Sequence, residues 1–544
     1  MRILDKNKFI YFMLLIIIVC YANCFNSSVM FDPQFSFKRD TANMYCIHGM
    51  YDSSLFSNDP VVKNFRKSIS ILCPDLLYFG IYSIMMHVFS LPIAIKILPI
   101  ILCIFATILI YRIGIYLYSQ EQAFLLSGVF LIYFLSMDSF YGGQQRSFGA
   151  LIFCIFVFFF IKENFIFLPF VIILAISFYP TLSVTLAATC ILSILFFHNK
   201  LAQFKKHNMY IFLLFSTTII SFIIGLQSLW FKLALKNLAV IQDYKYSQGA
   251  DVPINPHNPF HILWYFVLNM NEHTMQYVFF TKSFIILALF FTIFRNKKAF
   301  QLPKQIWIML LASALSFLII YPIHPTSASR QFVFTIPLFL VFFSTINISN
   351  IMKERLNAFF ILLPLALLFI ILHPIYNATL STRKYKPIYD YIGNLPKDTM
   401  IAGYPSSLLV ESLPLFSKRT IFFADKLRDL SLFVYEPQEL KRMRKRLIEI
   451  IYTDSQDKLD SFISDYKIDY FVIESYLYEN SFINLLNNSM RQYEHKVYSV
   501  IKSEQHQNDY LLLRLAQEYY DFKLYQDGNY IYILNSKRIK REYK

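Results

Sequence analysis

Acidic residues are scarce through most of this 544-residue chain. Only eight occur between Ile69 and Tyr376, whereas 56% of the whole sequence is hydrophobic and 18% is aromatic. A water-soluble globule could not cover so much apolar surface with so few charges. A soluble protein is therefore excluded, and the composition predicts a polytopic α-helical membrane protein.

Cysteine is absent after Cys190, so the C-terminal third contains no disulfide. Cys46 and Cys73 lie close enough in the sequence to pair if they are extracytoplasmic, and the sequence leaves this open. Three motifs are also missing: the G-x-x-x-x-G-K-[ST] loop, a zinc-ligand spacing and a G-x-S-x-G elbow. Coupling to ATP and hydrolase chemistry therefore receive no support.

Charge divides the chain into two parts. Residues 1–377 contain 26 Lys+Arg and 13 Asp+Glu, a net charge of +13, whereas residues 378–544 contain 25 and 22, a net charge of +3. This predicts a transmembrane domain over 1–377 and a soluble domain over 378–544. Positive charge around membrane helices is typical of contact with a lipid bilayer and does not indicate a nucleic-acid partner.

Apolar segments of spanning length follow one another through the first part. Eleven spans are predicted, at 9–25, 92–111, 123–138, 147–161, 164–180, 181–198, 209–226, 276–294, 305–322, 331–348 and 357–375. The segment 70–90 contains Pro74 and Asp75 near its start and is predicted as a re-entrant or interfacial helix.

The distribution of basic residues orients these spans. With eleven spans, the cytoplasmic segments carry 14 basic residues and the later outer connections carry five. The positive-inside rule then places the N-terminus in the cytoplasm, and both the first outer loop (26–68) and the C-terminal domain outside the membrane. The predicted localisation is a bacterial inner membrane.

The C-terminal domain reads as α/β. Strands are predicted at Met400–Ala402, Thr420–Phe423, Tyr470–Ile473, Lys496–Ile501 and Tyr530–Leu534, with helices at 436–452 and 457–466.

The first outer loop concentrates ionisable side chains. Asp32, Asp40, His48, Asp52 and Asp59 fall within 28 residues. Carboxylates held at a membrane face can bind a divalent cation such as Mg or Mn, or one can act as a general base. Asp32 and Asp59 each precede a proline and can equally be turn residues. Asp40 has no turn signature and is therefore the stronger candidate.

Two later connections on the predicted outer side carry cations. Arg146 lies in MDSFYGGQQRSFG (137–149), while His324 and Arg330 lie in YPIHPTSASRQF (321–332). Guanidinium and imidazolium groups suit a phosphate. The alternatives are a cation that reaches lipid headgroups, for Arg146, and an ordinary helix-connecting loop, for the other two.

Four segments resemble the GT-C superfamily of polytopic glycosyltransferases, which includes protein O-mannosyltransferases and aminoarabinose transferases. They are HGMYDSSLFSNDP, GGQQRSFGALIF, YIGNLPKDTMIAGYP and DYKIDYFVIES. Unlike those families, the loop contains no adjacent Asp-Asp or Asp-Glu pair.

The resemblance implies a glycosyltransferase with a polyprenyl-phosphate sugar as donor and a saccharide, lipid or protein as acceptor. Asp40, and second Asp32, would be the general base or metal ligand. Arg146, His324 and Arg330 would bind the lipid phosphate. Three other functions stay open: a lipid-linked saccharide transporter or flippase, an O-antigen polymerase or ligase, and a non-catalytic relative.

Overall fold

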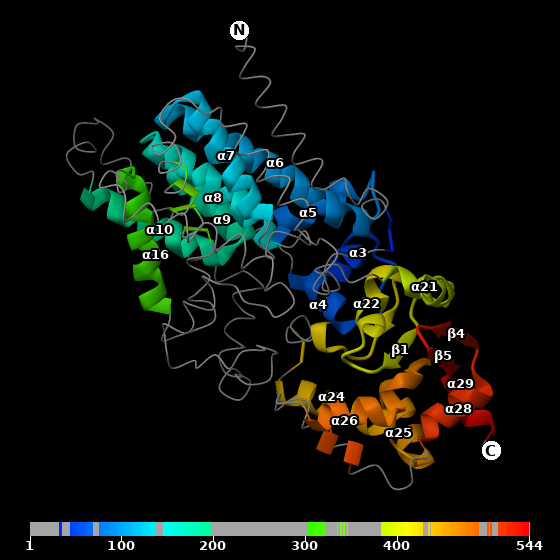
Figure 1. Cartoon of the computed structure of the whole chain (residues 1–544). Helices are drawn as coiled ribbons and strands as arrows, with labels where there is room; N and C mark the ends of the chain where they lie inside the picture. Colours follow the sequence, from blue (N-terminus) through cyan, green and yellow to red (C-terminus); the bar gives the residue numbers. More distant parts are fainter. Residues whose placement is uncertain are drawn as a thin grey trace.

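The structure is a computed structural model of the whole chain (Figure 1). It describes residues 32–34, 44–68, 75–135, 145–196, 302–320, 334–335, 338–339, 341–342, 345, 382–427, 434–435, 437–488, 498–499, 501–502 and 510–542. These residues are mostly helical, with one small sheet near the C-terminus.

Apolar helices form the first part of the described chain. They are α6 (Leu91–Leu117), α7 (Gln120–Leu135), α8 (Gln145–Ile161), α9 (Leu168–Phe178), α10 (Pro180–Phe196) and α16 (Lys304–Ile320). A 3-10 turn, η3 (Phe165–Phe167), leads into α9. Consecutive helices run back and forth, and α6 lies against both α7 and α8 (Figure 1). A Cβ atom on Gly114 would lie 2.6 Å from the Cα atom of Ala123, so the backbones of α6 and α7 touch there.

The described helices account for six of the predicted spans in position. Helix α6 has 27 residues, about 40 Å at 1.5 Å per residue, and is the one described helix long and apolar enough to cross a bilayer. Four others are apolar but shorter. The predicted spans at 9–25, 209–226, 276–294 and 357–375 lie outside the described residues, and 331–348 lies largely outside them. The count of eleven therefore remains a prediction.

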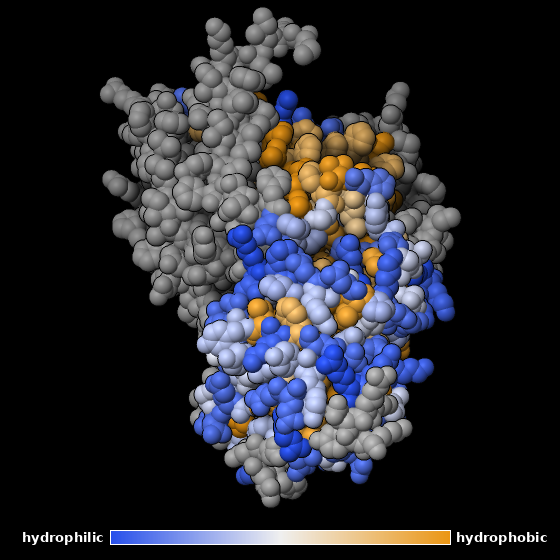
Figure 2. All heavy atoms as spheres, turned by 90° about the vertical axis from the view of Figure 1, so that its right-hand side faces the viewer, coloured by the Kyte–Doolittle hydropathy of each residue, from blue (hydrophilic) through white to orange (hydrophobic). Residues whose placement is uncertain are grey.

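The bundle is apolar both inside and outside. Phe124, Phe153 and Phe156 are buried in its core, while Phe105 and Leu195 are 54% and 71% exposed. Exposed side chains of this size suit lipid better than water. Figure 2 shows the change in character along the molecule, from apolar atoms at the top to hydrophilic atoms below.

Three short helices connect the bundle to the C-terminal part: α3 (Tyr45–Tyr51), α4 (Pro60–Ser68) and α5 (Asp75–Met85). Helix α5 has 11 residues, about 16 Å, which is about half of a hydrocarbon core. Ile84 and Val88, at and just beyond its end, are 71% and 76% exposed. The re-entrant or interfacial helix predicted for 70–90 stays a prediction, because residues 70–74 lie outside the described residues.

The C-terminal part contains a five-stranded sheet in the order β2-β1-β3-β5-β4. The strands are β1 (Met400–Gly403), β2 (Thr420–Ile421), β3 (Tyr470–Glu474), β4 (Phe522–Gln526) and β5 (Asn529–Asn535). Strands β1, β2 and β3 are parallel, whereas β5 is antiparallel to β3 and to β4. In the register, Ile401 lies opposite Tyr470 and Phe471 lies opposite Leu534.

Helices cover both faces of this sheet. One layer holds α21 (Lys386–Gly393) and α22 (Leu408–Phe416); the other holds α24 (Pro437–Ile451), α25 (Gln456–Tyr466), α26 (Asn480–Asn488) and α28 (Leu511–Tyr519), and α29 (Ser536–Glu542) follows β5. Side chains alternate along β3: Val472 packs on the first layer, and Phe471 and Ile473 on the second. This period of two gives each face its own core.

Most predicted elements of the α/β part are confirmed. Four predicted strands correspond to β1, β2, β3 and β5, and the two predicted helices to α24 and α25. The strand predicted at Lys496–Ile501 is wrong, because residues 498, 499 and 501 are helical. Strand β4 was not predicted; it pairs with β5 through a two-residue turn, Asp527-Gly528, whose positive φ angles of 51° and 84° are typical of a tight hairpin.

Candidate functional site

The described residues 44–68 of the predicted first outer loop form packed structure between the bundle and the C-terminal part, and we call this segment the wedge. Tyr45 and Ile47 of α3 and Val62 of α4 are buried in one core together with Leu415 and Leu427 of the C-terminal part. Apolar side chains at this spacing on two short helices have no core of their own, so they must pack against both neighbours. The loop that carries the candidate acids is therefore held by residues more than 350 positions away.

Expressed alone, residues 385–544 are expected to keep mixed helix and strand content in circular dichroism, because both cores of the sheet lie within this part. The isolated domain would, however, expose Leu415 and Leu427, which the loop normally covers. We expect Leu427→Ser to reduce its self-association in size-exclusion chromatography. A disordered product would show that the wedge supports the fold itself.

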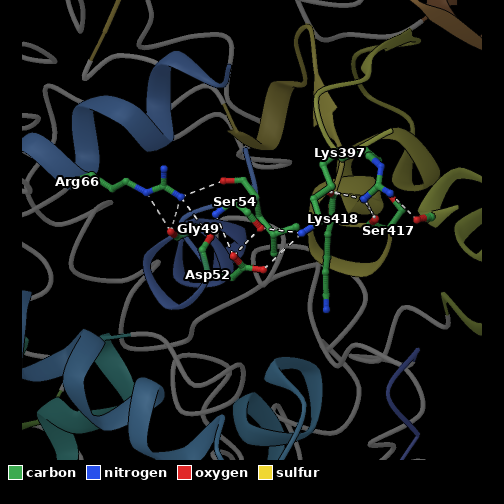
Figure 3. Close-up of polar contacts among 10 residues, drawn as sticks. Gly49, Asp52, Ser54, Arg66, Lys397, Ser417 and Lys418 are labelled. Atoms are coloured by element: carbon green, nitrogen blue, oxygen red, sulfur yellow. Dashed lines mark hydrogen bonds and ion pairs between the residues drawn. The ribbon is translucent and has the colours of Figure 1, made fainter. Parts of the chain in front are cut away.

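Arg66 fixes the shape of the wedge (Figure 3). Its guanidinium donates to the carbonyl oxygen of Gly49 from Nε at 2.9 Å and from Nη2 at 2.5 Å, and Nη2 also donates to the carbonyls of Leu55 at 2.9 Å and Asp52 at 3.2 Å. These carbonyls lie in the last turn of α3 and just beyond it, where no further helical N–H groups follow to bind them. The arginine thus ties α4 to the end of α3.

Asp59 is the N-cap of α4. Its Oδ1 accepts from the backbone N–H groups of Val61 and Val62 at 2.8 and 3.1 Å, and Tyr45 donates its hydroxyl to Oδ2 at 3.3 Å. Burial raises the pKa of Asp59 to about 6. A carboxylate that accepts these backbone N–H groups stabilises the start of α4. This agrees with the alternative that Asp59, which precedes a proline, is a turn residue.

The raised pKa makes Asp59 a pH-dependent contributor to stability. Protons bind the folded chain more readily than the unfolded one between pH 3.8 and about 6, so stability from this group rises as pH falls through that window. Asp59→Asn keeps the cap and removes the titration. We expect it to be more stable than wild type at pH 8, by up to about 3 kcal/mol, with the difference vanishing near pH 4. Thermal melting across pH tests this; a constant difference contradicts it.

His48 joins the wedge to the C-terminal part. Its Nε2 donates to the carbonyl oxygen of Leu415 at 3.0 Å, and the side chain is buried. Burial, and then the nearby charge of Lys418, lowers the pKa of His48 to about 4. A neutral imidazole bound to a main-chain carbonyl at the end of α22 is a structural contact between the two parts.

Asp52 lies on the surface of the same junction (Figure 3). Its Oδ1 accepts from the backbone N–H and the hydroxyl of Ser54 at 2.9 and 2.6 Å. Lys397 donates to the Ser54 hydroxyl at 2.7 Å and lies 3.9 Å from Asp52 Oδ2. The hydrogen bonds from Ser54 lower the pKa of Asp52, so this exposed carboxylate is ionised.

Asp32 is held between the bundle and the C-terminal part. Its Oδ1 accepts from the backbone N–H of Gln34 at 2.9 Å, and Oδ2 lies 3.4 Å from Nε of Arg383. Lys96 of α6 donates from its buried side chain to the main-chain carbonyl of Asp32, and the Thr382 hydroxyl donates to that of Gln34. The Asp32 carboxylate therefore lies beside Arg383, while Lys96 binds the Asp32 main chain to the second turn of the apolar helix α6.

The remaining predicted site residues are described only in part. Asp40, His324 and Arg330 lie outside the described residues, and of Arg146 only the backbone, in the first turn of α8, is described. A Cβ on Gly149 would lie 3.0 Å from the ring of Phe334, which also lies 6.0 Å from the ring of Tyr179. Gly149, near the start of α8, therefore lies beside Tyr179 at the end of α9. It also lies beside Phe334, which follows Arg330 by four residues. Phe148 extends this group to Tyr78 of α5, at 5.8 Å between rings.

The described residues do not form a metal site. They contain no group of three or more histidine, cysteine, aspartate or glutamate side chains suited to a cation. Both carboxylate oxygens of Asp32 are engaged, by Gln34 and by Arg383.

The Cys46–Cys73 pair that the sequence leaves open stays open. Cys46 is a free, buried thiol, and Cys73 lies outside the described residues.

Sequence reasoning missed four cations that shape this region: Arg66, Lys96, Arg383 and Lys397. Lys96 carried a signal, because it is the one charged residue between Leu91 and Tyr111. A charge inside an apolar segment is costly and marks a specific contact. The other three lie in ordinary polar stretches, where nothing distinguishes them from a solvated surface.

Comparisons with known proteins find similarity among solved structures only. No family model matches the chain. No curated protein matches it either. Among solved structures, the Archaeoglobus fulgidus oligosaccharyltransferase tethered to an acceptor peptide is similar, with 7% identity, a TM-score of 0.44, and coverage of 98% of this chain and 74% of that one. At this TM-score and identity, the likeness defines neither the fold nor the function of this chain.

Proposed function

We propose that this protein is a membrane glycosyltransferase that moves a sugar from a polyprenyl-phosphate donor to an acceptor at the outer face of the membrane. The observation that carries the proposal is the position of Asp32, whose carboxylate lies 3.4 Å from Arg383 and whose main-chain carbonyl accepts from Lys96 in the second turn of α6. Apolar helices suit a prenyl chain, cations suit its phosphate, and a carboxylate suits proton transfer from the acceptor.

The reaction is a displacement at the anomeric carbon with inversion. The acceptor oxygen or nitrogen forms the new bond to that carbon, the bond to the polyprenyl phosphate oxygen breaks, and the phosphate leaves with the electron pair. The acceptor proton goes to a carboxylate, Asp40 in our assignment, with Asp32 as the second candidate. Arg146, His324 and Arg330 stabilise the leaving phosphate. A single base opposite a well-held leaving group suffices for this displacement.

The test is covalent transfer by the purified full-length chain in proteoliposomes. A polyprenyl-phosphate hexose with a labelled sugar is supplied, and mass spectrometry of saccharide, lipid and protein fractions identifies the product. Labelled product that depends on the chain supports the proposal. Movement of the donor across the bilayer with its glycosidic bond intact would identify a lipid-linked saccharide transporter instead.

The proposed topology places the first loop (26–68) and the domain 378–544 on the outer side. Its support is the direct contact of His48 with Leu415 and of Ser54 with Lys397, because segments that touch in water lie on one face of a membrane. A cysteine at exposed position 52 and a reporter after Tyr376 are both expected to be extracytoplasmic. Labelling on opposite faces contradicts the eleven-span arrangement.

A further inference from the structure

One face of the β4–β5 hairpin carries a cluster that the proposed chemistry does not use. Lys523 lies directly across the strands from Tyr532, and Tyr525 lies across from Tyr530. Tyr520, just before β4, lies 5.8 Å from Tyr532 between ring centroids. We call these four tyrosines with Lys523 the tyrosine platform.

The platform is the exposed aromatic surface of the C-terminal part. Tyr520, Tyr525 and Tyr530 are 41%, 61% and 40% exposed, and among the described residues from 382 onward no other large hydrophobic side chain is exposed. The ring centroids of Tyr525 and Tyr530 lie 4.9 Å apart, and the buried ring of Tyr532, which is 3% exposed, links Tyr530 to Tyr520 at 6.0 and 5.8 Å. Large apolar rings gathered at one place on an otherwise polar surface indicate a binding site.

Lys523 gives this surface a positive charge that its neighbours do not cancel. Its ammonium group lies 4.0 Å from the ring centroid of Tyr530, and 5.4 and 5.6 Å from those of Tyr532 and Tyr520. The two acids nearest in sequence are paired elsewhere: Asp521 with Arg538 at 2.7 Å, and Asp527 with Lys384 at 2.8 Å. The charge is therefore available to an anionic ligand.

The platform is also rigid. The opposite face of the hairpin, with Phe522, Leu524, Ile531 and Ile533, packs onto the core beneath α21 and α22. The tight turn at Asp527-Gly528 fixes the register of the two strands. Rings held in place before binding lose little conformational freedom when a ligand arrives.

We propose that the tyrosine platform binds an acidic saccharide chain. The ring faces can cover the apolar faces of sugar rings, the phenol hydroxyls can hydrogen-bond their hydroxyl groups, and Lys523 can pair with a carboxylate. A peptide ligand is less suited, because the described part of this surface exposes no aliphatic side chain to receive one. A lipid surface is less suited because β4 and β5 lie on the side remote from α6–α10 (Figure 1).

This inference deepens the proposed function by naming the class of saccharide that the chain holds, and it can be tested without donor or transfer. The purified full-length chain in detergent is titrated calorimetrically with hexagalacturonate, and separately with neutral maltohexaose and with hexaglutamate. We expect hexagalacturonate to bind most tightly. Lys523→Gln should weaken this binding by about tenfold to a hundredfold. Tyr525→Ala should weaken it by about threefold to tenfold.

Lys537→Gln is the matched control, because it removes an exposed lysine outside the platform and should leave binding unchanged. Equal loss in Lys523→Gln and Lys537→Gln overturns the assignment, as does the absence of binding to hexagalacturonate. Equal affinity for hexaglutamate would overturn the saccharide assignment, because the platform would then bind negative charge of any kind. Phosphatidylglycerol liposomes form a fourth titration, and tighter binding to them than to hexagalacturonate would overturn it in favour of a lipid contact. Loss of transfer in an Asp40 variant bears on the proposed reaction only.

Discussion

Replacing Asp40 by asparagine is expected to lower sugar transfer by about 10²–10⁴-fold while the chain still folds, because a general base contributes about that much to rate. The asparagine keeps the size of the side chain and loses its charge and basicity. Transfer from a labelled polyprenyl-phosphate sugar is measured in proteoliposomes at equal expression. If Asp32 is the base instead, the loss should follow Asp32→Asn, which also removes the ion pair with Arg383.

The matched control is Asp59→Asn in the same loop. Asp59 caps α4 and lies buried beneath Tyr45, and asparagine is an equally good cap. Transfer should therefore change little in this variant. Loss of transfer in Asp59→Asn with full activity in Asp40→Asn would show that the wrong acid was assigned. If none of the three asparagine variants loses activity, the first loop is not the active site.

Replacing Arg66 by alanine is expected to destabilise the first loop by about 3 kcal/mol or more. The guanidinium supplies hydrogen bonds to the carbonyls of Gly49, Asp52 and Leu55, and charged hydrogen bonds of this kind contribute about 1.5–3 kcal/mol each. Without the guanidinium, the carbonyls of Gly49 and Leu55 lose these hydrogen bonds in a partly buried place, whereas that of Asp52 keeps the backbone N–H of Leu55 at 3.2 Å. Limited proteolysis of the full-length chain should then cut between α3 and α4.

Lys67→Ala controls for this experiment, because Lys67 is the next residue on α4 and is exposed. It removes one positive charge and a long side chain without touching the carbonyls that Arg66 binds. Proteolysis and thermal melting should stay close to wild type. Equal sensitivity of the two variants to protease would mean that the positive charge of α4, and not the hydrogen bonds of Arg66, holds the loop.

Much of the secondary structure of the C-terminal part could be predicted from the sequence because its patterns are strong. The continuous β-branched and aromatic run at Tyr470–Ile473 predicts a buried strand, and the helical spacing of apolar residues at Pro437–Ile451 predicts a helix. The mistakes have a common cause. The Lys496–Ile501 run is short, and short apolar runs do not distinguish strand from helix. Strand β4 mixes lysine, tyrosine and leucine and is fixed as a strand by pairing with β5.

The acids of the first loop illustrate what sequence alone could and could not assign. That Asp32 and Asp59 precede proline was visible, and both do accept local backbone N–H groups. Whether such an acid is buried depends on what packs over it. Tyr45 and the apolar wedge bury Asp59, whereas the Asp32 carboxylate lies beside Arg383.

The sequence by itself determined the apolar bundle, the acidic loop and the charged C-terminal α/β part, because composition and periodicity act locally along the chain. Only the tertiary structure decided that residues 44–68 of the loop pack between the apolar bundle and the C-terminal part and join them. His48 meets Leu415 and Arg383 meets Asp32 across more than 350 residues, and Lys96 meets the Asp32 main chain across 64. Such contacts join residues far apart in the sequence, so they depend on how the surfaces of the bundle, the loop and the C-terminal part fit in shape and charge.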